Sequence, residues 1–397
     1  MTVVIVGAGQ AGATTAAELR RVGFTDPIVV FNGESEASYE RPPLSKGYLK
    51  GDDSAFTPID LPGDVDVRTG VEVTGVDTGA RTVTAGGETV AWDQLVLATG
   101  VAPLVLDLPG ADKAFYLRDK PDSDRLRAAL QDATSVIVVG GSWLGLETAA
   151  AAREHGAQVT VVADTPNLTK MGPVIGGIYA DVHREHGVVL ELEAEIAEVL
   201  VDGDRATGLR FADGRPLEAD VVVMCTGSTP RLELAQAAGV EIDENTKGVK
   251  VDASLRSSVP GVWAVGDIAA IDNPVSGAQA RIEHWALALD GAKIAAHSIA
   301  GTERDRVDFL PFFFSDQFDF SMEIAGGANP EADIVFRGST EAPREFIAFW
   351  RMDDGKVVAA MNANTWDVTE TLQELIKSGK PVPRARLEDP AIPLDQL

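Results

Sequence analysis

The chain carries the same pattern of strand, glycine turn and helix twice, and this repeat constrains the fold more than any other feature. In the first copy the apolar run 3–6 precedes the three glycines of a G-x-G-x-x-G turn, which are Gly7, Gly9 and Gly12. Residues 13–21 then have the composition and apolar spacing of a helix. In a dinucleotide-binding fold such glycines make the tight turn, admit a pyrophosphate and pack helix against strand. The first copy therefore predicts a dinucleotide at the helix N-terminus.

An acidic residue strengthens this prediction. Residues 27–31 ("PIVVF") are predicted to form the second strand, and Glu34 follows at about the distance where an acid binds a ribose hydroxyl. A glycine triplet alone is a weak signal, because any tight turn can require glycine. Strand, turn, helix, strand and acid in this order are much more specific.

The second copy departs from the pattern at its middle glycine. A strand at 136–139 precedes the turn, and a helix at 145–155 and a strand at 157–164 follow it. The turn residues are Gly140, Gly141, Ser142 and Gly145, with Ser142 where the second glycine is expected. Asp164 is the candidate ribose-binding acid, since Ala163 stands where Glu is common. Two units predict two dinucleotides; the alternative is that the second turn only joins strand to helix.

Charge limits the partners of the protein. The chain has 34 Lys and Arg against 61 Asp and Glu, a net charge of −27, and a field of that sign repels nucleic acid and anionic membranes. No apolar run approaches the length of a membrane span, and the first residues leave no room for a signal segment. We therefore expect a cytoplasmic protein with neither nucleic-acid nor membrane partners.

Cysteine and histidine give no sign of a metal site. The single cysteine, Cys225, excludes an internal disulfide, a C-x-x-C redox pair and a thiolate zinc cluster. It lies in an apolar run and is predicted to be a small buried side chain. His183 and His186 are spaced i, i+3, but the neighbouring Arg184 and Glu185 indicate a solvated helix end. We expect no metal.

Further motifs occur along the whole chain. In order they are the first glycine turn, "YERPPLSKGYL" (39–49), "LVLATG" (95–100), "GGSWLGLE" (140–147), "VWAVGDI" (262–268), "RIEHWALAL" (281–289) and "PFFFSDQFDF" (311–320). This series resembles the FAD-dependent, NADH-using ferredoxin reductases of bacterial cytochrome P450 and Rieske oxygenase systems, within the glutathione-reductase-like superfamily. The "RPPLSK" and "EHW" motifs are the most specific parts of the resemblance.

The resemblance implies roles for individual residues. The first turn and Glu34 correspond to the cradle for the adenosine and pyrophosphate of FAD. Further FAD contacts correspond to Arg41, Lys46, Val73, Arg118, Asp267 and Trp285. Among these, Arg41 and Lys46 lie beside the flavin, Lys46 near its reactive edge, Asp267 binds the ribityl chain and Trp285 packs against the ring. The second turn corresponds to the NADH site, with Glu147 near the nicotinamide. Lys46, Glu147 and Trp285 are the candidate catalytic residues.

The predicted fold class is α/β, with two doubly wound dinucleotide-binding domains and a C-terminal α+β domain. We expect the NADH domain to be inserted into the FAD domain. The predicted ranges are 1–107 (FAD domain, first part), 108–240 (NADH domain), 241–310 (FAD domain, second part) and 311–397 (C-terminal domain).

Two local signals lie in the C-terminal region. Residues 344–364 are predicted to form two strands joined at Asp354-Gly355. A helix is predicted to follow, with Asp367 and Glu370 as its capping box and Gly379 just past its end.

The resemblance implies that the enzyme transfers a hydride from NADH to FAD and then single electrons to a two-iron two-sulfur ferredoxin that feeds an oxygenase. The alternatives are an NADH oxidase or diaphorase without a protein acceptor, and a non-enzymatic NADH-sensing flavoprotein. NADH is expected over NADPH, because residues 163–169 contain no Arg or Lys for a 2′-phosphate. Docking of an acidic ferredoxin would need a basic patch such as Arg41, Lys46 and Lys50.

Ser142 carries a prediction of its own. We expect its Cβ to push the ligand or the turn outward, so that Ser142→Gly binds NADH more tightly.

Overall fold

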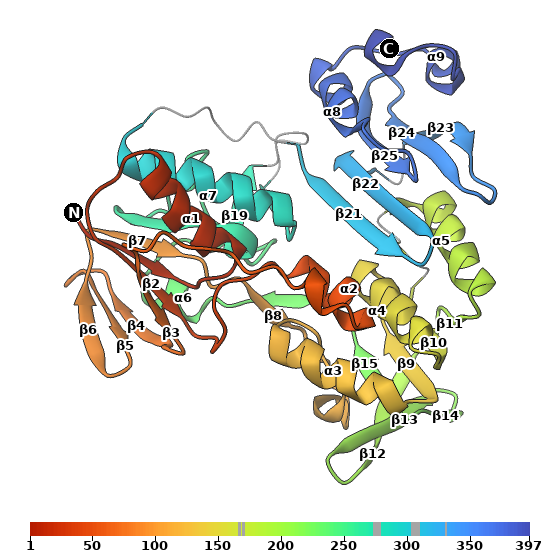
Figure 1. The fold of residues 1–397 in the computed structure, drawn as a ribbon, viewed down its shortest axis with the longest axis horizontal. Helices are drawn as coiled ribbons and strands as arrows, with labels where there is room; N and C mark the ends of the chain where they lie inside the picture. Colours follow the sequence, from red (N-terminus) through yellow and green to blue (C-terminus); the bar gives the residue numbers. More distant parts are fainter. Residues whose placement is uncertain (166–167, 169–170, 273–278, 303–309, 330–331) are drawn as a thin grey trace. The chain divides into compact units, whose positions relative to one another are not determined.

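The computed structural model describes residues 1–397 except 166–167, 169–170, 273–278, 303–309 and 330–331 (Figure 1). The chain divides into two compact units, each made of three separate segments. Unit 1 consists of Met1–Arg41, Thr57–Ala102 and Ser228–Phe312. Unit 2 consists of Pro42–Phe56, Pro103–Gly227 and Phe313–Leu397. Strands β8 (Val101–Pro103) and β16 (Ser228–Pro230) lie where the chain passes from one unit to the other.

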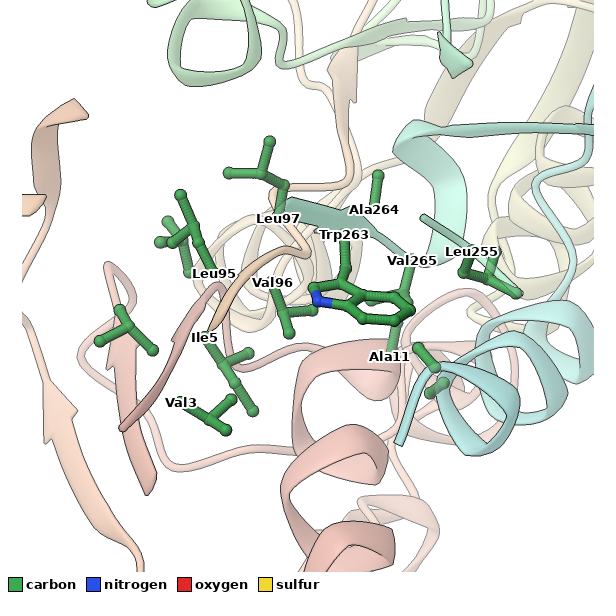
Figure 2. Packing of buried hydrophobic residues seen from close by; sticks show 14 of the residues in the cluster. Val3, Ile5, Ala11, Leu95, Val96, Leu97, Leu255, Trp263, Ala264 and Val265 are labelled. Carbon is green, nitrogen blue, oxygen red and sulfur yellow. The ribbon is translucent and has the colours of Figure 1, made fainter. Parts of the chain in front are cut away.

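A parallel sheet forms the centre of unit 1. Its order is β18-β7-β1-β2-β3, with strands Val262–Ala264, Gln94–Leu97, Val3–Val6, Ile28–Asn32 and Asp66–Thr69. Every residue of β1 and β2 is buried, as expected for a parallel sheet covered on both faces. Helix α1 (Gln10–Arg21) follows β1 and packs against α7 (Trp285–Ala300). Figure 2 shows the sheet residues Val3, Ile5 and Leu95 in this core, together with Trp263.

Smaller elements complete unit 1. Strands β4 (Val73–Asp77), β5 (Thr82–Ala85) and β6 (Glu88–Ala91) form an antiparallel sheet. A second three-stranded sheet contains β17 (Val249–Lys250), β19 (Ala269–Asp272) and β20 (Gln279–Arg281). The described part of unit 1 also contains the helix α6 (Glu233–Ala237) and the 3-10 turn η5 (Gly266–Ile268).

Unit 2 repeats the parallel arrangement. The order is β11-β10-β9-β15, with strands Val189–Glu191, Gln158–Val162, Ser135–Val139 and Val221–Met224. The helices of this part are α3 (Lys120–Asp132), α4 (Trp143–Glu154) and α5 (Pro173–Glu185), with the 3-10 turn η3 (Ala111–Lys113). Strands β12 (Ile196–Asp202), β13 (Arg205–Phe211) and β14 (Pro216–Glu218) form an antiparallel sheet. The two predicted parallel sheets, each with a glycine turn after its central strand, are thereby confirmed.

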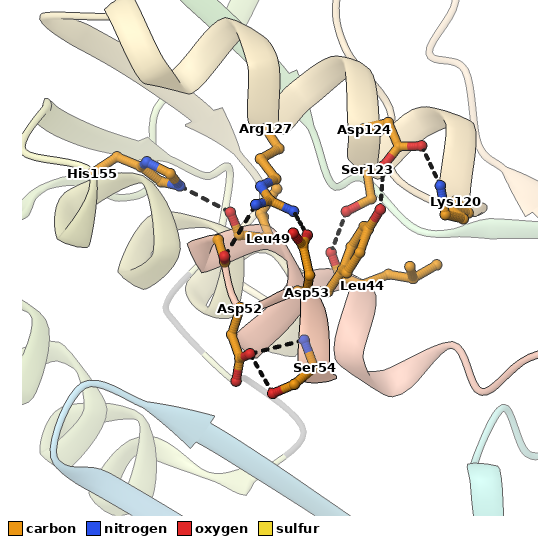
Figure 3. Close-up of polar contacts among 12 residues, drawn as sticks. Leu44, Leu49, Asp52, Asp53, Ser54, Lys120, Ser123, Asp124, Arg127 and His155 are labelled. Carbon is orange, nitrogen blue, oxygen red and sulfur yellow. Dashed lines mark hydrogen bonds and ion pairs between the residues drawn. The ribbon is translucent and has the colours of Figure 1, made fainter. Parts of the chain in front are cut away.

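The segment 42–56, which holds all of "RPPLSK" except Arg41, belongs to unit 2, although the predicted range placed it in the first part of the FAD domain. It contains η1 (Pro42–Ser45), α2 (Gly47–Lys50) and η2 (Asp53–Ala55). Figure 3 shows its polar contacts: Ser123 Oγ donates to the Leu44 carbonyl (2.9 Å), and His155 Nε2 donates to the Leu49 carbonyl (2.9 Å). Leu49 itself is fully buried in the core of the second parallel sheet. These contacts hold the segment on α3 and α4.

The C-terminal part of unit 2 contains a five-stranded sheet of order β21-β22-β25-β24-β23. The strands are Phe312–Gln317, Phe320–Gly326, Val357–Ala363, Glu345–Arg351 and Asp333–Ser339, and η6 (Leu394–Gln396) lies near the chain end. The predicted hairpin is confirmed, because β24 and β25 are antiparallel neighbours and Gly355 between them has φ +87°. Helices α8 (Thr369–Ser378) and α9 (Arg384–Glu388) follow.

The predicted capping box of α8 is wrong, whereas its predicted end is correct. Asp367 has a left-handed backbone (φ +62°), and the residue that caps the helix is Val368, which has no side-chain acceptor. The Thr369 hydroxyl is directed to the Glu323 carboxylate instead. Gly379 ends the helix with φ +58°, as the sequence predicted.

Candidate functional site

The first glycine turn has two crowded positions and one open position. A Cβ on Gly7 would lie 2.3 Å from the Ala98 carbonyl oxygen, and one on Gly12 would lie 1.9 Å from the Gly7 carbonyl oxygen. Gly7 also has φ +103°, which favours glycine. Gly9 has ordinary extended geometry (φ −68°), and the nearest atom to its Cβ would be Arg41 Nη2 at 3.8 Å. The space in front of Gly9 and the N-terminus of α1 is therefore the part of the turn suited to a ligand.

Two charged side chains lie at this turn. The Arg41 guanidinium, next to Gly9, donates to the Glu34 carboxylate, which also accepts a hydrogen bond from the Tyr39 hydroxyl. The predicted residues Gly9, Glu34 and Arg41 thus come together within unit 1. They provide free helix N–H groups, a cation and a carboxylate, which are the groups that a pyrophosphate and a ribose hydroxyl require.

Asp267 and Trp285 are placed near the start of α1. Trp285 Nε1 donates to Gln10 Oε1 (3.0 Å), and Gln10 is the first residue of that helix. Asp267 lies in η5 directly after Gly266, whose Cβ would lie 2.8 Å from the Cβ of Ala11. Val73 opens strand β4 with its side chain buried in the core of unit 1.

The second turn has the same two crowded positions. A Cβ on Gly140 would lie 2.3 Å from the Cys225 carbonyl oxygen, and one on Gly145 would lie 2.0 Å from the Gly140 carbonyl oxygen. Ser142 caps helix α4 with φ −87° and ψ 179°, and its exposed side chain makes no capping hydrogen bond. The serine fits the turn without a left-handed backbone. The predicted effect on the ligand stays a prediction.

A buried cluster surrounds Glu147, two residues after Gly145. Lys46 Nζ forms an ion pair with Glu147 Oε2 (2.8 Å), and the Ser45 hydroxyl donates to the same oxygen (2.6 Å). The Ser315 hydroxyl donates to Oε1 (2.6 Å). The side chains of Glu147 and Lys46 are only 4% and 13% exposed, so the pair is largely removed from water. Three donors satisfy a carboxylate that would otherwise be costly to bury.

Lys46 also lies 5.3 Å from the ring centre of Phe314. The structure therefore joins the candidate catalytic residues Lys46 and Glu147 inside unit 2, whereas Trp285 belongs to unit 1. Arg118 is in unit 2 as well, where its backbone N–H donates to Asp122 (3.0 Å) just before α3. Asp164 is exposed just past β10.

Two family models cover most of the chain. Residues 1–292 match the pyridine nucleotide-disulphide oxidoreductase model, and residues 312–397 match the reductase C-terminal model. The chain belongs to the pyridine nucleotide-disulphide oxidoreductase family. It is therefore an oxidoreductase, and this membership implies binding of FAD and NAD(H).

Curated relatives cover the whole length of this reductase. It is 35% identical over 403 residues to the ferredoxin–NAD(+) reductase component of the p-cumate 2,3-dioxygenase system of Pseudomonas putida, covering 99% of this chain and 97% of that protein. It is 34% identical over 402 residues to the corresponding component of the anthranilate 1,2-dioxygenase system of Burkholderia cepacia, covering 98% of each chain.

Solved structures of similar proteins lead to the same family. The ferredoxin reductase of the CYP199A2 system from Rhodopseudomonas palustris superposes with a TM-score of 0.92 at 32% identity, covering 99% of this chain and 98% of that chain. The covalent putidaredoxin reductase–putidaredoxin complex superposes with a TM-score of 0.92 at 30% identity, covering 99% of this chain and 97% of that chain. The resemblance to ferredoxin reductases of oxygenase systems is confirmed.

The one cysteine of this reductase, Cys225, is a buried side chain, as predicted. Cys225 is fully buried, and burial raises the pKa of its thiol to about 12. It follows the last strand of the parallel sheet and lies behind both crowded glycines of the second turn, since a Cβ on Gly145 would also be 3.5 Å from the Cys225 Cβ. A thiol in this environment acts as a small apolar side chain.

His183 was predicted at a solvated helix end, and this is wrong. Its side chain is completely buried, because the last turn of α5 packs against Phe318 beside strand β21. His183 Nε2 donates to Gln317 Oε1 (2.8 Å), and burial lowers the pKa of the imidazole to about 4. The polar neighbours Arg184 and Glu185 point to solvent on the other side of the helix end. Among the described residues, no group of three or more His, Cys, Asp or Glu could hold a metal ion.

The predicted docking cations are not unpaired charges. Arg41 pairs with Glu34, Lys46 with Glu147, and Lys50 Nζ with Glu154 at 2.7 Å. Each cation is thus offset by a carboxylate in its own unit. In the part of the chain that the structure describes, no helix is long and apolar enough to cross a membrane.

Sequence reasoning missed the serines that hold Glu147. Ser45 lies inside "RPPLSK" and Ser315 inside "PFFFSDQFDF", so both were within recognised motifs. Nothing in the local sequence indicates that residues so far apart meet on one carboxylate.

Proposed function

We propose that this reductase takes a hydride from NADH onto FAD and passes electrons singly to a two-iron two-sulfur ferredoxin that supplies a cytochrome P450 or Rieske oxygenase. The observation that carries the proposal is the state of Cys225. A disulfide-reducing enzyme needs a reactive thiolate, and the one cysteine of this chain is buried, with its thiol pKa raised to about 12. Electrons therefore leave the protein without a thiol intermediate.

Bound FAD would supply the chemistry of accepting two electrons together and releasing them one at a time. The protein holds it with the N–H groups at the first turn and the Arg41 guanidinium for the pyrophosphate, and with Glu34 for the ribose. Asp267 would accept from the hydroxyls of the ribityl chain, and Trp285, fixed by Gln10, would limit the position of the ring.

Lys46 acts as preplaced positive charge rather than as an acid. Its ammonium is held by the Glu147 carboxylate and would supply positive charge to bound FAD without any rearrangement. Glu147 itself lies in the first turns of α4, next to the second glycine turn, and so orients Lys46 close to the NADH site.

NADH is the proposed donor. Asp164, exposed after β10, binds ribose hydroxyls and repels a 2′-phosphate, and residues 163–169 provide no cation to accept one.

The test is NADH-dependent cytochrome c reduction by the FAD-loaded protein, with and without two-iron two-sulfur ferredoxins from neighbouring genes. We expect reduction to require a ferredoxin and to be slower with NADPH. Equal rates without any ferredoxin, accompanied by oxygen consumption, would show an oxidase or diaphorase instead. A spectral response to NADH without turnover to any acceptor would show a sensing protein.

A further inference from the structure

A chain of hydrogen bonds runs through the interior of unit 2 and ends on Glu147. The Ser315 hydroxyl donates to Glu147 Oε1 (2.6 Å), Gln317 Nε2 donates to Ser315 Oγ (3.0 Å), and His183 Nε2 donates to Gln317 Oε1 (2.8 Å). His183, Gln317, Ser315 and Glu147 are all buried. The chain connects helix α5, strand β21 and helix α4.

Each bond in the chain can have only one direction. A hydroxyl has a single proton, and Ser315 gives its proton to the carboxylate, so its oxygen must accept from the Gln317 amide nitrogen. That choice turns the Gln317 carbonyl oxygen toward His183, which must then carry its proton on Nε2. His183 Nδ1 has no hydrogen-bond partner among the described residues, as expected for the unprotonated nitrogen of a neutral ring.

All three donors therefore point toward Glu147. The opposite side of that carboxylate is occupied by Lys46 and Ser45, both on Oε2. Without Ser315, Oε1 would be a buried carboxylate oxygen with no donor among these residues, which carries a large desolvation penalty. A neutral imidazole at the far end keeps the chain free of an additional charge.

We propose that Gln317 and Ser315, aligned by His183, are positioning residues for the Lys46–Glu147 pair and thereby set the positive charge that Lys46 presents to the flavin. The hydrogen bond from Ser315 offsets the negative charge of Glu147, so less of the Lys46 charge is cancelled. This inference rests on the proposed function, in which Lys46 lies beside bound FAD.

The inference predicts the reduction potential of bound FAD. Ser315→Ala removes the donor and leaves Glu147 less compensated, so reduction should become about tenfold less favourable, a fall of about 30 mV for a two-electron couple. Gln317→Met keeps the side-chain volume but removes the hydrogen bond that directs the Ser315 hydroxyl. The reduction potential should therefore also fall in this variant, but by less. Spectroelectrochemical titration of the FAD-loaded variants measures both.

A matched control comes from the same sheet. Asn362 in β25 is equally buried and hydrogen-bonded, to Glu323 and the Thr365 carbonyl, but lies outside the chain that ends on Glu147. Asn362→Leu should lower the stability without moving the potential. A second readout is the ¹⁵N NMR signal of His183, which should report a neutral ring protonated on Nε2 in the wild type.

The outcomes separate this inference from the proposed function. If Lys46→Met leaves the potential unchanged, Lys46 does not act on the flavin and that part of the proposed function fails. If Lys46→Met lowers the potential but Ser315→Ala and Gln317→Met do not, the positioning inference alone is overturned. A His183 proton on Nδ1, or the same potential shift in Asn362→Leu, would also overturn it.

Discussion

The two glycine turns share one backbone geometry but differ at their middle residue, which is Gly9 in the first turn and Ser142 in the second. Gly7 donates to the Phe31 carbonyl (2.9 Å) as Gly140 does to the Val162 carbonyl (2.8 Å). In each turn the first and third glycines are crowded by the chain's own carbonyl oxygens, while the middle residue has a negative φ. Packing within the protein therefore requires glycine at the outer positions, whereas it leaves the middle position open to a larger residue such as Ser142.

The same comparison explains Cys225. Its backbone N–H bonds to the Val139 carbonyl (2.7 Å), and the equivalent bond in the first sheet joins Ala98 to the Val6 carbonyl (2.8 Å). Cys225 and Ala98 thus occupy one structural position, directly behind the crowded glycines, where only a small side chain fits.

The largest expected effect follows from the outer glycines. In Gly12→Ala and Gly145→Ala the new Cβ would lie 1.9 Å and 2.0 Å from a carbonyl oxygen, so each variant should lose stability. The loss should be about 3 kcal/mol or more, measured by denaturant unfolding. Gly12→Ala should lose FAD, whereas Gly145→Ala should keep FAD and lose NADH binding. Equal loss of FAD in both would mean that the turns do not serve separate ligands.

We also expect the two units to respond differently to acid. Because the folded pKa of His183 is about 4 against an ordinary value of 6.5, the unfolded state binds an extra proton between these pH values. Stability should therefore fall as pH drops from about 6.5 to 4, by about 3 kcal/mol from this residue. In unit 1, His297 Nε2 lies 3.1 Å from the Glu18 carboxylate instead of an amide oxygen.

Unfolding curves across this pH range measure the effect. His183→Gln should flatten the dependence, and His297→Gln serves as the control. An unchanged pH dependence in His183→Gln would contradict the assignment of a buried neutral ring.

Substitutions at the middle position should have a smaller effect, which is a change in ligand affinity of opposite sign in the two turns. Ser142→Gly should tighten NADH binding by up to about tenfold, or about 1.4 kcal/mol, because the Cβ no longer limits the approach of the pyrophosphate. The reciprocal Gly9→Ser should fold, since its Cβ meets nothing closer than 3.8 Å, but should bind FAD less tightly. Titration with a non-reducing NADH analogue decides the first case; weaker binding by the glycine variant would make Ser142 a ligand.

The smallest effect is expected at Cys225, which is structurally equivalent to Ala98 of the first sheet. Cys225→Ala gives the second sheet the same residue that Ala98 provides at this position in the first sheet. We expect the free energy of unfolding to fall by less than about 1.5 kcal/mol and turnover to be retained. Steady-state ferredoxin reduction by the FAD-loaded variant tests this. Lost turnover in a folded variant would show that the thiol takes part in electron transfer.

Features encoded within one short stretch were predictable. The strand at 136–139, the glycine turns and the end of α8 at Gly379 all follow from local periodicity or a single backbone requirement. The sequence showed that Ser142 takes the middle position of the second turn. Whether a serine fits there depends on the backbone φ angle, which the sequence does not give.

Features that depend on distant partners were not predictable. The segment at 42–56 joins unit 2 through Ser123 and His155, which lie far along the chain. The burial of His183 results from strand β21, and polar neighbours in sequence concealed it. Asp367 matches a capping box by spacing, but the backbone places it in a left-handed conformation.

The alternation of segments between the units has a consequence for protein engineering. Six segments alternate, so the chain passes between the units five times and neither unit is a contiguous piece. A chimera that exchanges 103–227 alone would separate its core from Leu49, which packs with Leu126 and Val136, and from Phe320, which packs on Tyr179. A nucleotide-binding cassette transferable between such reductases must therefore carry three segments, not one.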